Sequence, residues 1–271
     1  MHSITFPAYV LEDFPTVSAE QMQNIDNEML DICDLTIYQM MEKAGSAIAE
    51  VASCYTSEIF PDVALLIGKG NNGGGALVAG RYLANKGARL QVILAASENE
   101  LDPVPTKQLK VLRGCHPDTP VHDMSMISAD NLPSMPDCDL ILDGLLGYNI
   151  DGDPREPIST LINLANGAEV PTISVDLPSG MDPDSGEPAA PTILAAATIT
   201  LAVPKRGFQN QSAHQYLGEM YMADIGICPS LITKIIETEL FPRDLPELLF
   251  LYSSGEAGSN GQQKESSVIE L

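Results

Sequence analysis

The sequence contains few positive charges and no long apolar run, and both absences restrict what the protein can bind. Only 14 of its 271 residues are lysine or arginine, against 37 aspartates and glutamates, so the formal net charge is −23. A field of that sign repels the phosphates of nucleic acids and anionic membrane surfaces. The longest apolar stretches, such as 63–68 and 195–203, are about half the length of a membrane-spanning helix or less. We expect neither a nucleic-acid-binding protein nor a membrane protein.

Metal-binding patterns of cysteine and histidine are also missing. The five cysteines, at positions 33, 54, 115, 138 and 228, are scattered, with no CxxC motif and no pair of histidines nearby. This spacing is typical of reduced thiols in a cytosolic protein and does not suggest a zinc site. The N-terminus lacks the basic start and the apolar run of a secretory signal. We therefore expect a cytoplasmic protein.

The pattern of apolar residues predicts an α/β fold. Capping boxes at Ser18 and Thr36 predict the starts of two helices, and the later part of the chain alternates short apolar runs with helical segments. The predicted strands cover residues 63–68, 90–94, 139–143, 172–176, 197–203 and 219–224, and the helices between them cover 76–85, 106–113 and 156–165. This order indicates a Rossmann-like, mostly parallel, doubly wound sheet. We expect one domain over 1–250 and a flexible polar tail over 251–271.

The most specific motif is the glycine-rich segment from Gly68 to Gly75, between a predicted strand and a predicted helix. Its sequence, GKGNNGGG, differs from the GxGxxG of dehydrogenases because Asn71 and Asn72 follow Gly70. Free N–H groups at a helix start attract phosphate, and glycine lets the backbone approach a ligand closely. A tight turn without a ligand is the alternative, although five glycines in eight residues carry a high entropic cost for a turn. The segment therefore predicts a pyrophosphate site.

Two predicted strands end in aspartate, at Asp143 and Asp176. Ligands of open α/β sheets bind outside the carboxyl ends of the strands, so both residues lie at the functional edge. Two carboxylates there repel unless a proton or a cation lies between them. A cation shared with the Asn72 amide oxygen and the Ser179 hydroxyl would suit this oxygen-rich set. The alternative is that each aspartate caps a helix or closes a turn.

Lys205 ends the predicted strand 197–203 in a chain with few bases. It either supplies local positive potential to the edge of the sheet or is an ordinary surface lysine, and its spacing leaves both interpretations open.

Taken together, these motifs resemble the YjeF N-terminal domain, the NAD(P)H-hydrate epimerase family. The resemblance extends over residues 15–240 and rests on MMEKAG at 40–45, GNNGG at 70–74, DGLLG at 143–147, VDLPSG at 175–180, and Lys205 with DIGI at 224–227. It implies a three-layer αβα sandwich that forms a homodimer. It also implies an isomerase that interconverts the R and S forms of hydrated NADH and NADPH, which a separate NAD(P)H-hydrate dehydratase then repairs.

The resemblance also implies roles for individual residues. Asp176 would contact the hydrated nicotinamide, and we expect it to act as catalytic acid and base, since one carboxyl group can serve both steps. Asn72, Asp143 and Ser179 would hold a potassium ion. The dinucleotide would be lined by Asn71, Asn72, Gly73, Gly74 and Gly75, and by Gly147, Tyr148, Asn149, Ile150, Asp151, Gly152 and Asp153.

One departure from the family pattern supports an alternative function. The family loop continues Gly-Gly-Asp-Gly, whereas this chain has Gly75 and Ala76. A catalytically weak or inactive nucleotide-binding or scaffold protein of the same fold is therefore a second hypothesis. A nicotinamide-dependent dehydrogenase is disfavoured because the strand 90–94 runs into Ala95 and Ala96 and not into an acidic residue. An ATP-dependent dehydratase is disfavoured because the chain has no P-loop.

Overall fold

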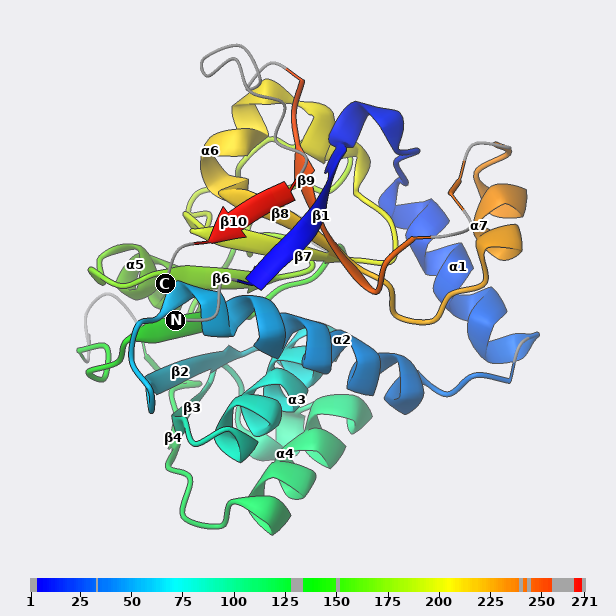
Figure 1. Ribbon diagram of the computed structural model, residues 1–271. Coiled ribbons are helices and arrows are strands. Elements are labelled where there is room, and N and C mark those ends of the chain that lie inside the picture. Colours follow the sequence, from blue (N-terminus) through cyan, green and yellow to red (C-terminus); the bar gives the residue numbers. More distant parts are fainter. Residues whose placement is uncertain are drawn as a thin grey trace.

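The computed structural model describes residues 4–32, 34–127, 134–149, 152–238, 241–242, 245–254 and 266–269. In this part of the chain the strands form one sheet in the order β10-β1-β9-β8-β7-β6-β5-β2-β3-β4 (Figure 1). The strands are β1 (Ile4–Val10), β2 (Asp62–Ile67), β3 (Arg89–Leu94), β4 (Val121–Asp123), β5 (Leu140–Gly144), β6 (Thr172–Val175), β7 (Ala197–Leu201), β8 (Glu219–Ala223), β9 (Leu248–Tyr252) and β10 (Ser266–Ile269).

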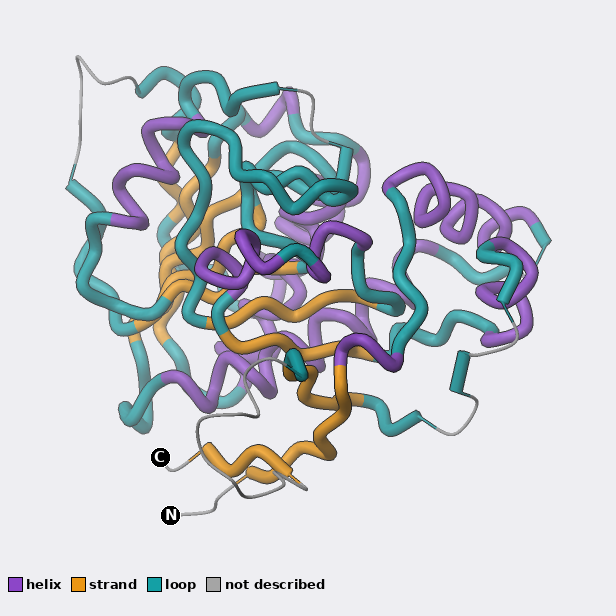
Figure 2. The backbone as a smooth tube through the Cα atoms, turned by 90° about the horizontal axis from the view of Figure 1, so that it is seen from above, coloured by secondary structure: helices purple, strands orange, loops and turns teal. Residues whose placement is uncertain are grey.

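Helices cover both faces of this sheet. They are α1 (Ala19–Asp31), α2 (Ile37–Ala52), α3 (Asn71–Asn85), α4 (Pro103–Cys115), α5 (Ile158–Asn166), α6 (His214–Leu217) and α7 (Pro229–Ile235). Short 3-10 turns lie at Leu11–Asp13, Ser53–Tyr55, Glu98–Glu100, Arg206–Gln209 and Gln211–Ala213. Figure 2 shows the strands as a twisted layer between helices, with α1 and α7 beside each other at one end. The predicted α/β sandwich of three layers is confirmed.

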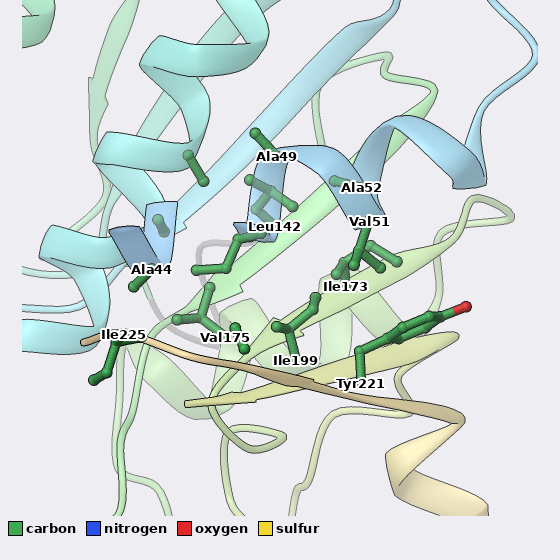
Figure 3. Packing of buried hydrophobic residues seen from close by; sticks show 14 of the residues in the cluster. Ala44, Ala49, Val51, Ala52, Leu142, Ile173, Val175, Ile199, Tyr221 and Ile225 are labelled. Carbon is green, nitrogen blue, oxygen red and sulfur yellow. The ribbon is translucent and has the colours of Figure 1, made fainter. Parts of the chain in front are cut away.

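Alternating side chains of the central strands pack against different helices. Val63, Leu65 and Ile67 of β2 join a cluster with residues of α2 and α3. Ala64 and Leu66 point the other way and join a cluster with α5. This period of two is what a strand buried on both faces requires. Figure 3 shows the α2 side of the core, where Ala44 and Ala49 lie over Leu142, Ile173 and Val175.

The sheet changes direction of growth between β2 and β5. From β2 the chain adds β3 and β4 on one side, then returns to place β5, β6, β7 and β8 on the other side, all parallel. The loops after β2 and β5 therefore leave the sheet from neighbouring strands in different directions. Such a switch point opens a crevice at the carboxyl ends of the strands.

All six predicted strands are present, each within two residues of its predicted ends. The two predicted capping boxes are also confirmed. Ser18 caps α1 through reciprocal hydrogen bonds with Gln21, and Thr36 caps α2 through the same bonds with Gln39. The predicted start of the next helix at residue 76 was wrong. Helix α3 begins at Asn71, so the glycines from Gly73 to Gly75 lie inside its first turns and not in a loop before it.

The sequence did not predict the strands β1, β4, β9 and β10. β9 pairs antiparallel with β8 and parallel with β1, and it extends to Tyr252, two residues past the predicted domain end at 250. Ser266–Ile269 of the predicted tail pair with β1. Residues 255–265 and 270–271 lie outside the described residues, so the flexibility of the tail stays a prediction. Within the described ranges, no helix combines the length and apolar character needed to cross a membrane.

Candidate functional site

A cavity of about 470 Å³ opens at the carboxyl ends of the parallel strands, at the switch point. Its volume falls in the range of small-molecule sites. The walls come from α1, α2, the start of α3, and the loops that follow β2, β3, β5, β6 and β7. Of the residues predicted to bind the dinucleotide, the cavity is lined by Asn71, Asn72, Gly75, Gly147, Tyr148, Asn149 and Asp176. Segments that are far apart in sequence therefore meet around one space.

The glycine-rich segment shapes the mouth of this cavity. Gly70 caps α3 without a side-chain acceptor, so the first N–H groups of the helix are open to a ligand. Only glycine fits at position 68, because the Cβ of any other residue would lie 1.8 Å from the carbonyl oxygen of Leu145. This close approach holds the loops after β2 and β5 together. The start of α3 and the β5 loop consequently border the same opening.

Not all of the predicted dinucleotide residues line the cavity. Gly73 and Gly74 are buried and do not line the cavity. Neither position has room for a side chain, because added Cβ atoms would lie 2.3 Å from the Gly68 carbonyl oxygen and 2.8 Å from Val104 Cγ1. These glycines pack α3 against its own loop and α4. The Asp153 carboxylate accepts a hydrogen bond from Ala190 N at 2.9 Å, and neither it nor Gly152 borders the cavity. Ile150 and Asp151 lie outside the described residues.

Asp176 lies at the end of β6, where it forms an ion pair with Lys205. The Lys205 side chain is only 1% exposed, so the surface-lysine interpretation was wrong. Its Nζ also lies 3.2 Å from Thr200 Oγ1 and 3.4 Å from the carbonyl oxygens of Leu201 and Val203. Asp176 Oδ1 accepts a further bond from Leu201 N at 3.0 Å. This network holds a buried ammonium group at the cavity, in a chain whose net charge is −23.

The backbone at Asp176 is strained. Its φ is +69°, a left-handed conformation that a non-glycine residue adopts at a cost of about 1–3 kcal/mol. The Asp176 N–H donates to Ile199 O at 2.9 Å, which holds the residue in this conformation. The strain turns the chain sharply at the end of β6, and the Asp176 side chain lines the cavity.

Asp143 is fully buried behind the cavity and does not line it. Its carboxylate accepts four hydrogen bonds: from Ser179 Oγ at 2.6 Å, Ser179 N and Ser174 Oγ both at 2.9 Å, and Leu145 N at 3.2 Å. Burial raises the pKa of Asp143, and these hydrogen bonds oppose the rise only in part. The carboxyl group thus organises the loops after β5 and β6.

Two of the three predicted metal-binding residues, Asn72 and Ser179, meet at the carbonyl oxygen of Leu146, and the third, Asp143, is linked to it through Ser179. The Asn72 side-chain nitrogen donates to this oxygen at 2.7 Å and to Val175 O at 2.8 Å. Ser179 Oγ lies 3.4 Å from the same oxygen and is bonded to Asp143. Asn72 therefore presents its nitrogen to these carbonyls, where the predicted cation site required its oxygen. Among the described residues, no three His, Cys, Asp or Glu side chains cluster as metal ligands.

Sequence reasoning missed two further carboxyl groups that line the cavity, Asp102 after β3 and Asp26 of α1. Tyr148 Oη donates a 2.7 Å hydrogen bond to Asp26 Oδ2. Burial raises the pKa of Asp26 most, and the nearby Asp176 raises it further, while Tyr148 and Lys205 lower it. The sequence does indicate this position of Asp26. It follows Met22 by four residues and precedes Met29 by three, so it lies on the buried face of an amphipathic helix.

A further part of the cavity lining is apolar. Met22 of α1 and Met40 and Met41 of α2 line it, together with Ile37 and Ala44. Flexible, polarisable thioethers adapt to flat rings and other irregular shapes. The cavity thus combines apolar, flexible methionine side chains with charged groups.

A glycine-rich helix start at the switch point of a doubly wound sheet, with a lysine and an aspartate at adjoining strand ends, is typical of nucleotide-binding proteins of the α/β class. Comparison with known families narrows this class. The profile described as YjeF-related protein N-terminus matches residues 37–207, more than half of the chain. The chain belongs to the YjeF N-terminal family, as the sequence motifs predict.

Curated relatives agree with this assignment. The chain is 33% identical over 222 residues to the NAD(P)H-hydrate epimerase of Dehalogenimonas lykanthroporepellens, covering 80% of this chain and 84% of the relative. It is 33% identical over 213 residues to the epimerase of Cenarchaeum symbiosum, covering 79% of this chain and 96% of the relative. It is 32% identical over 233 residues to the bifunctional NAD(P)H-hydrate repair enzyme Nnr of Salinibacter ruber, covering 82% of this chain but only 43% of that relative.

A solved structure shares the fold. The crystal structure of the yeast protein ynu0 (YNL200c) superposes with a TM-score of 0.71 at 24% identity, covering 88% of this chain and all of the yeast chain. This likeness supports the three-layer architecture.

Proposed function

We propose that the protein is an isomerase that interconverts the R and S epimers of hydrated NADH and NADPH. Family membership and the names of the epimerase relatives support this function. The observation that carries it is the buried Asp176–Lys205 ion pair at the wall of a cavity that also contains the open start of α3. The α3 end can bind a pyrophosphate, and the ion pair can act on the ring at the other end of the ligand.

The reaction needs charge stabilisation and proton transfer. Carbon 6 of the hydrated ring carries a hydroxyl beside the ring nitrogen, so loss of the hydroxyl as water leaves an iminium that water can attack from either face. A carboxylate beside the ring stabilises the cation electrostatically and can accept a proton from the entering water. Because Asp176 forms an ion pair with Lys205 and lines the cavity, it suits the roles of base and electrostatic partner.

The dinucleotide fits along the border of the cavity. Its pyrophosphate would lie against the N–H groups of Asn71 and Asn72, where the helix dipole offsets the acidity of the chain. Gly75 leaves space next to Val175 and Met41, since an added Cβ would lie 3.5 Å from Val175 Cγ1 and 3.8 Å from Met41 Sδ. Tyr148 and Asn149 border the cavity from the β5 loop.

A potassium ion fits the group of oxygens around Leu146. Asp143 is a buried carboxylate, and no lysine, arginine or histidine pairs with it in the described ranges. Ser179 Oγ and the carbonyl oxygens of Leu146 and Val175 are the hard ligands that such an ion prefers. Rotation of the Asn72 amide would add Oδ1 to the set. When bound, the ion would balance the charge of Asp143 and fix the loop after β5.

The partners and location belong to the same proposal. A dehydratase would consume one epimer, and the Salinibacter relative, whose name includes both repair activities, supports that pairing. The described cysteines, Cys54, Cys115, Cys138 and Cys228, are all free, which fits the reducing cytoplasm. A homodimer could use the apolar surface at Ile59 and Phe60, which are 81% and 57% exposed.

One observation supports a second function, a nucleotide-binding protein without epimerase activity. The cavity has room for a side chain at position 75, but Gly75 supplies none. If a carboxylate at that position is needed for catalysis elsewhere in the family, this chain would bind the dinucleotide and leave its epimers unchanged.

The two functions are separated by following the epimers of hydrated NADPH by chromatography. A sample enriched in one epimer should equilibrate faster with the protein than without it, and the Asp176→Asn variant should lose most of this acceleration. Binding of the hydrate at an unchanged rate of equilibration would instead support the nucleotide-binding protein.

A further inference from the structure

The carboxyl group of Asp26 has no part in the function described so far. It lies on α1, before the stretch from residue 37 that the family profile matches. Met22, Ile25 and Met29 of the same helix are buried, and both Met22 and Asp26 line the cavity. A carboxyl group on the apolar face of a helix loses hydration, so its presence at the ligand cavity requires an explanation.

Tyr148 fixes the position of this carboxyl group. The 2.7 Å bond from Tyr148 Oη to Asp26 Oδ2 joins α1 to the loop after β5. In the described part of the chain, the charged groups that act on Asp26 are the Asp176 carboxylate and the Lys205 ammonium. Burial raises the pKa of Asp26 and the nearby Asp176 adds to that rise, whereas the Tyr148 hydrogen bond and Lys205 lower it.

We propose that Asp26 is the acid partner of Asp176 in the epimerisation, and that Tyr148 is a positioning residue for it. This inference rests on the proposed function. Two carboxyl groups in one site divide the work of acid and base when their surroundings differ. Lys205 pairs directly with Asp176, whereas Asp26 is held by the phenol of Tyr148 and forms no ion pair among the described residues.

The proton balance follows from this division. Protonated Asp26 donates to the C6 hydroxyl, the C–O bond breaks with its electron pair on oxygen, and water leaves. The lone pair of the ring nitrogen forms the iminium double bond. A second water attacks carbon 6 from the other face, the π electrons return to nitrogen, and Asp176 takes the proton of that water. Exchange with solvent then returns a proton to Asp26 and removes one from Asp176.

The first test compares Asp26→Asn with the wild-type protein in the epimer assay. The amide has the shape of the carboxyl group but is no acid, so kcat should fall by about 10²–10⁴. The dissociation constant of NADP⁺, used as the binding probe, should stay within a few-fold of wild type. Asp31→Asn is the matched control, because Asp31 lies exposed on the same helix, and it should leave epimerisation unchanged.

The second test uses the pH dependence of kcat/KM. The activity of the wild type should decline at high pH as Asp26 loses its proton. Tyr148→Phe removes a hydrogen bond that lowers the pKa of Asp26, so the alkaline limb of the profile should move to higher pH. A purely structural role for Tyr148 would lower activity without moving the limb. Asp26→Glu, which keeps a carboxyl group, should recover part of the activity lost in Asp26→Asn.

Each result decides the proposal. Full activity of folded Asp26→Asn beside an active wild type would overturn the role of Asp26 and leave the epimerase function intact. If Asp26→Asn does not fold, an unmoved alkaline limb in Tyr148→Phe overturns it instead. A wild-type protein that fails to accelerate epimer equilibration would overturn both the function and this inference.

Discussion

Lys205 is a charged side chain held almost entirely out of solvent in a strongly acidic protein. Four oxygen atoms surround its Nζ, and one of them belongs to the Asp176 carboxylate. Taking two charges out of water is costly, so the pair persists only because each charge compensates the other. Removing a single partner should therefore be far worse than removing both.

We expect Lys205→Met to reduce the free energy of unfolding by about 3–5 kcal/mol, because it leaves the Asp176 carboxylate buried and unpaired. The double variant Lys205→Met with Asp176→Asn should recover a large part of this loss. Urea unfolding of the two variants measures the difference. A double variant no more stable than Lys205→Met would contradict the ion-pair account.

Asp143 gives a prediction about pH. Its pKa is raised in the folded protein, so the folded state holds a proton over a pH range in which the unfolded state has lost it. The contribution of Asp143 to the free energy of unfolding therefore falls as pH rises from about 4, the ordinary value for aspartate, through its raised pKa. In Asp143→Asn this part of the pH dependence should disappear. Thermal unfolding from pH 4 to pH 8 without potassium measures it.

The same residue tests the potassium site. Above the raised pKa of Asp143, exchanging choline chloride for potassium chloride should raise the melting temperature of the wild type, because an ion bound only to the folded state stabilises it. Asp143→Asn should lose this response. An equal response in both proteins would show that potassium does not bind at Asp143.

At the scale of the single element, α3 shows what a glycine pattern does and does not reveal. The sequence correctly predicted that strand, glycines and helix follow one another, but it placed the helix start five residues too late, at 76 instead of Asn71. Glycine has a low helix propensity, so the run at 73–75 suggested a loop. Tertiary contacts override that propensity, because Gly73 and Gly74 sit where the loop before α3 and helix α4 leave no space for a side chain.

Two substitutions in α3 separate these effects. A Cβ on Gly73 would lie 2.3 Å from the Gly68 carbonyl oxygen, a backbone atom that cannot move alone, so Gly73→Ala should lower the free energy of unfolding by about 1–3 kcal/mol. Gly75→Ala should be neutral or stabilising by up to about 1 kcal/mol, because its Cβ has room and alanine favours helices. Equal losses in the two variants would contradict this difference.

Helix α1 shows why part of the site was missed. Its capping box and its apolar spacing were clear in the sequence, and the helix was predicted correctly. The contact of Asp26 with Tyr148, however, spans 122 residues and depends on how α1 docks beside the β5 loop. Local patterns contain no information about such docking, whereas strand-end residues such as Asp176 are located by the topology of the sheet alone.

For the whole molecule, the parallel strands from β8 to β3 were predictable, and the strands beyond them on both sides were not. Strands β2, β5, β6 and β7 are almost wholly buried and contain mainly apolar and β-branched residues, whereas β4 has only three residues. β9 was also missed, although Leu249 and Leu251 are buried between β8 and β1. One of its partners, β1, lies at the other end of the chain, so the place of β9 in the sheet cannot be read from neighbouring sequence.

This arrangement predicts a sharp boundary for truncation. A chain ending at Ser254 retains β9 and should unfold cooperatively, with a melting temperature close to that of the full chain. A chain ending at Glu247 loses β9 and the burial of its leucines, each worth about 1.5–3 kcal/mol, and exposes β1 and β8. It should not fold cooperatively. Circular dichroism melts of both chains test this, and similar stability would show that β9 is dispensable.

The central claim is that segments from distant parts of the chain form one cavity that holds the dinucleotide with its nicotinamide beside Asp176. A crystal structure of the protein with NADP⁺ and potassium tests it most directly. We predict the pyrophosphate against the N–H groups at the start of α3 and the nicotinamide between Asp26 and Asp176. NADP⁺ bound at a different surface, with the cavity closed by side chains, would contradict the account.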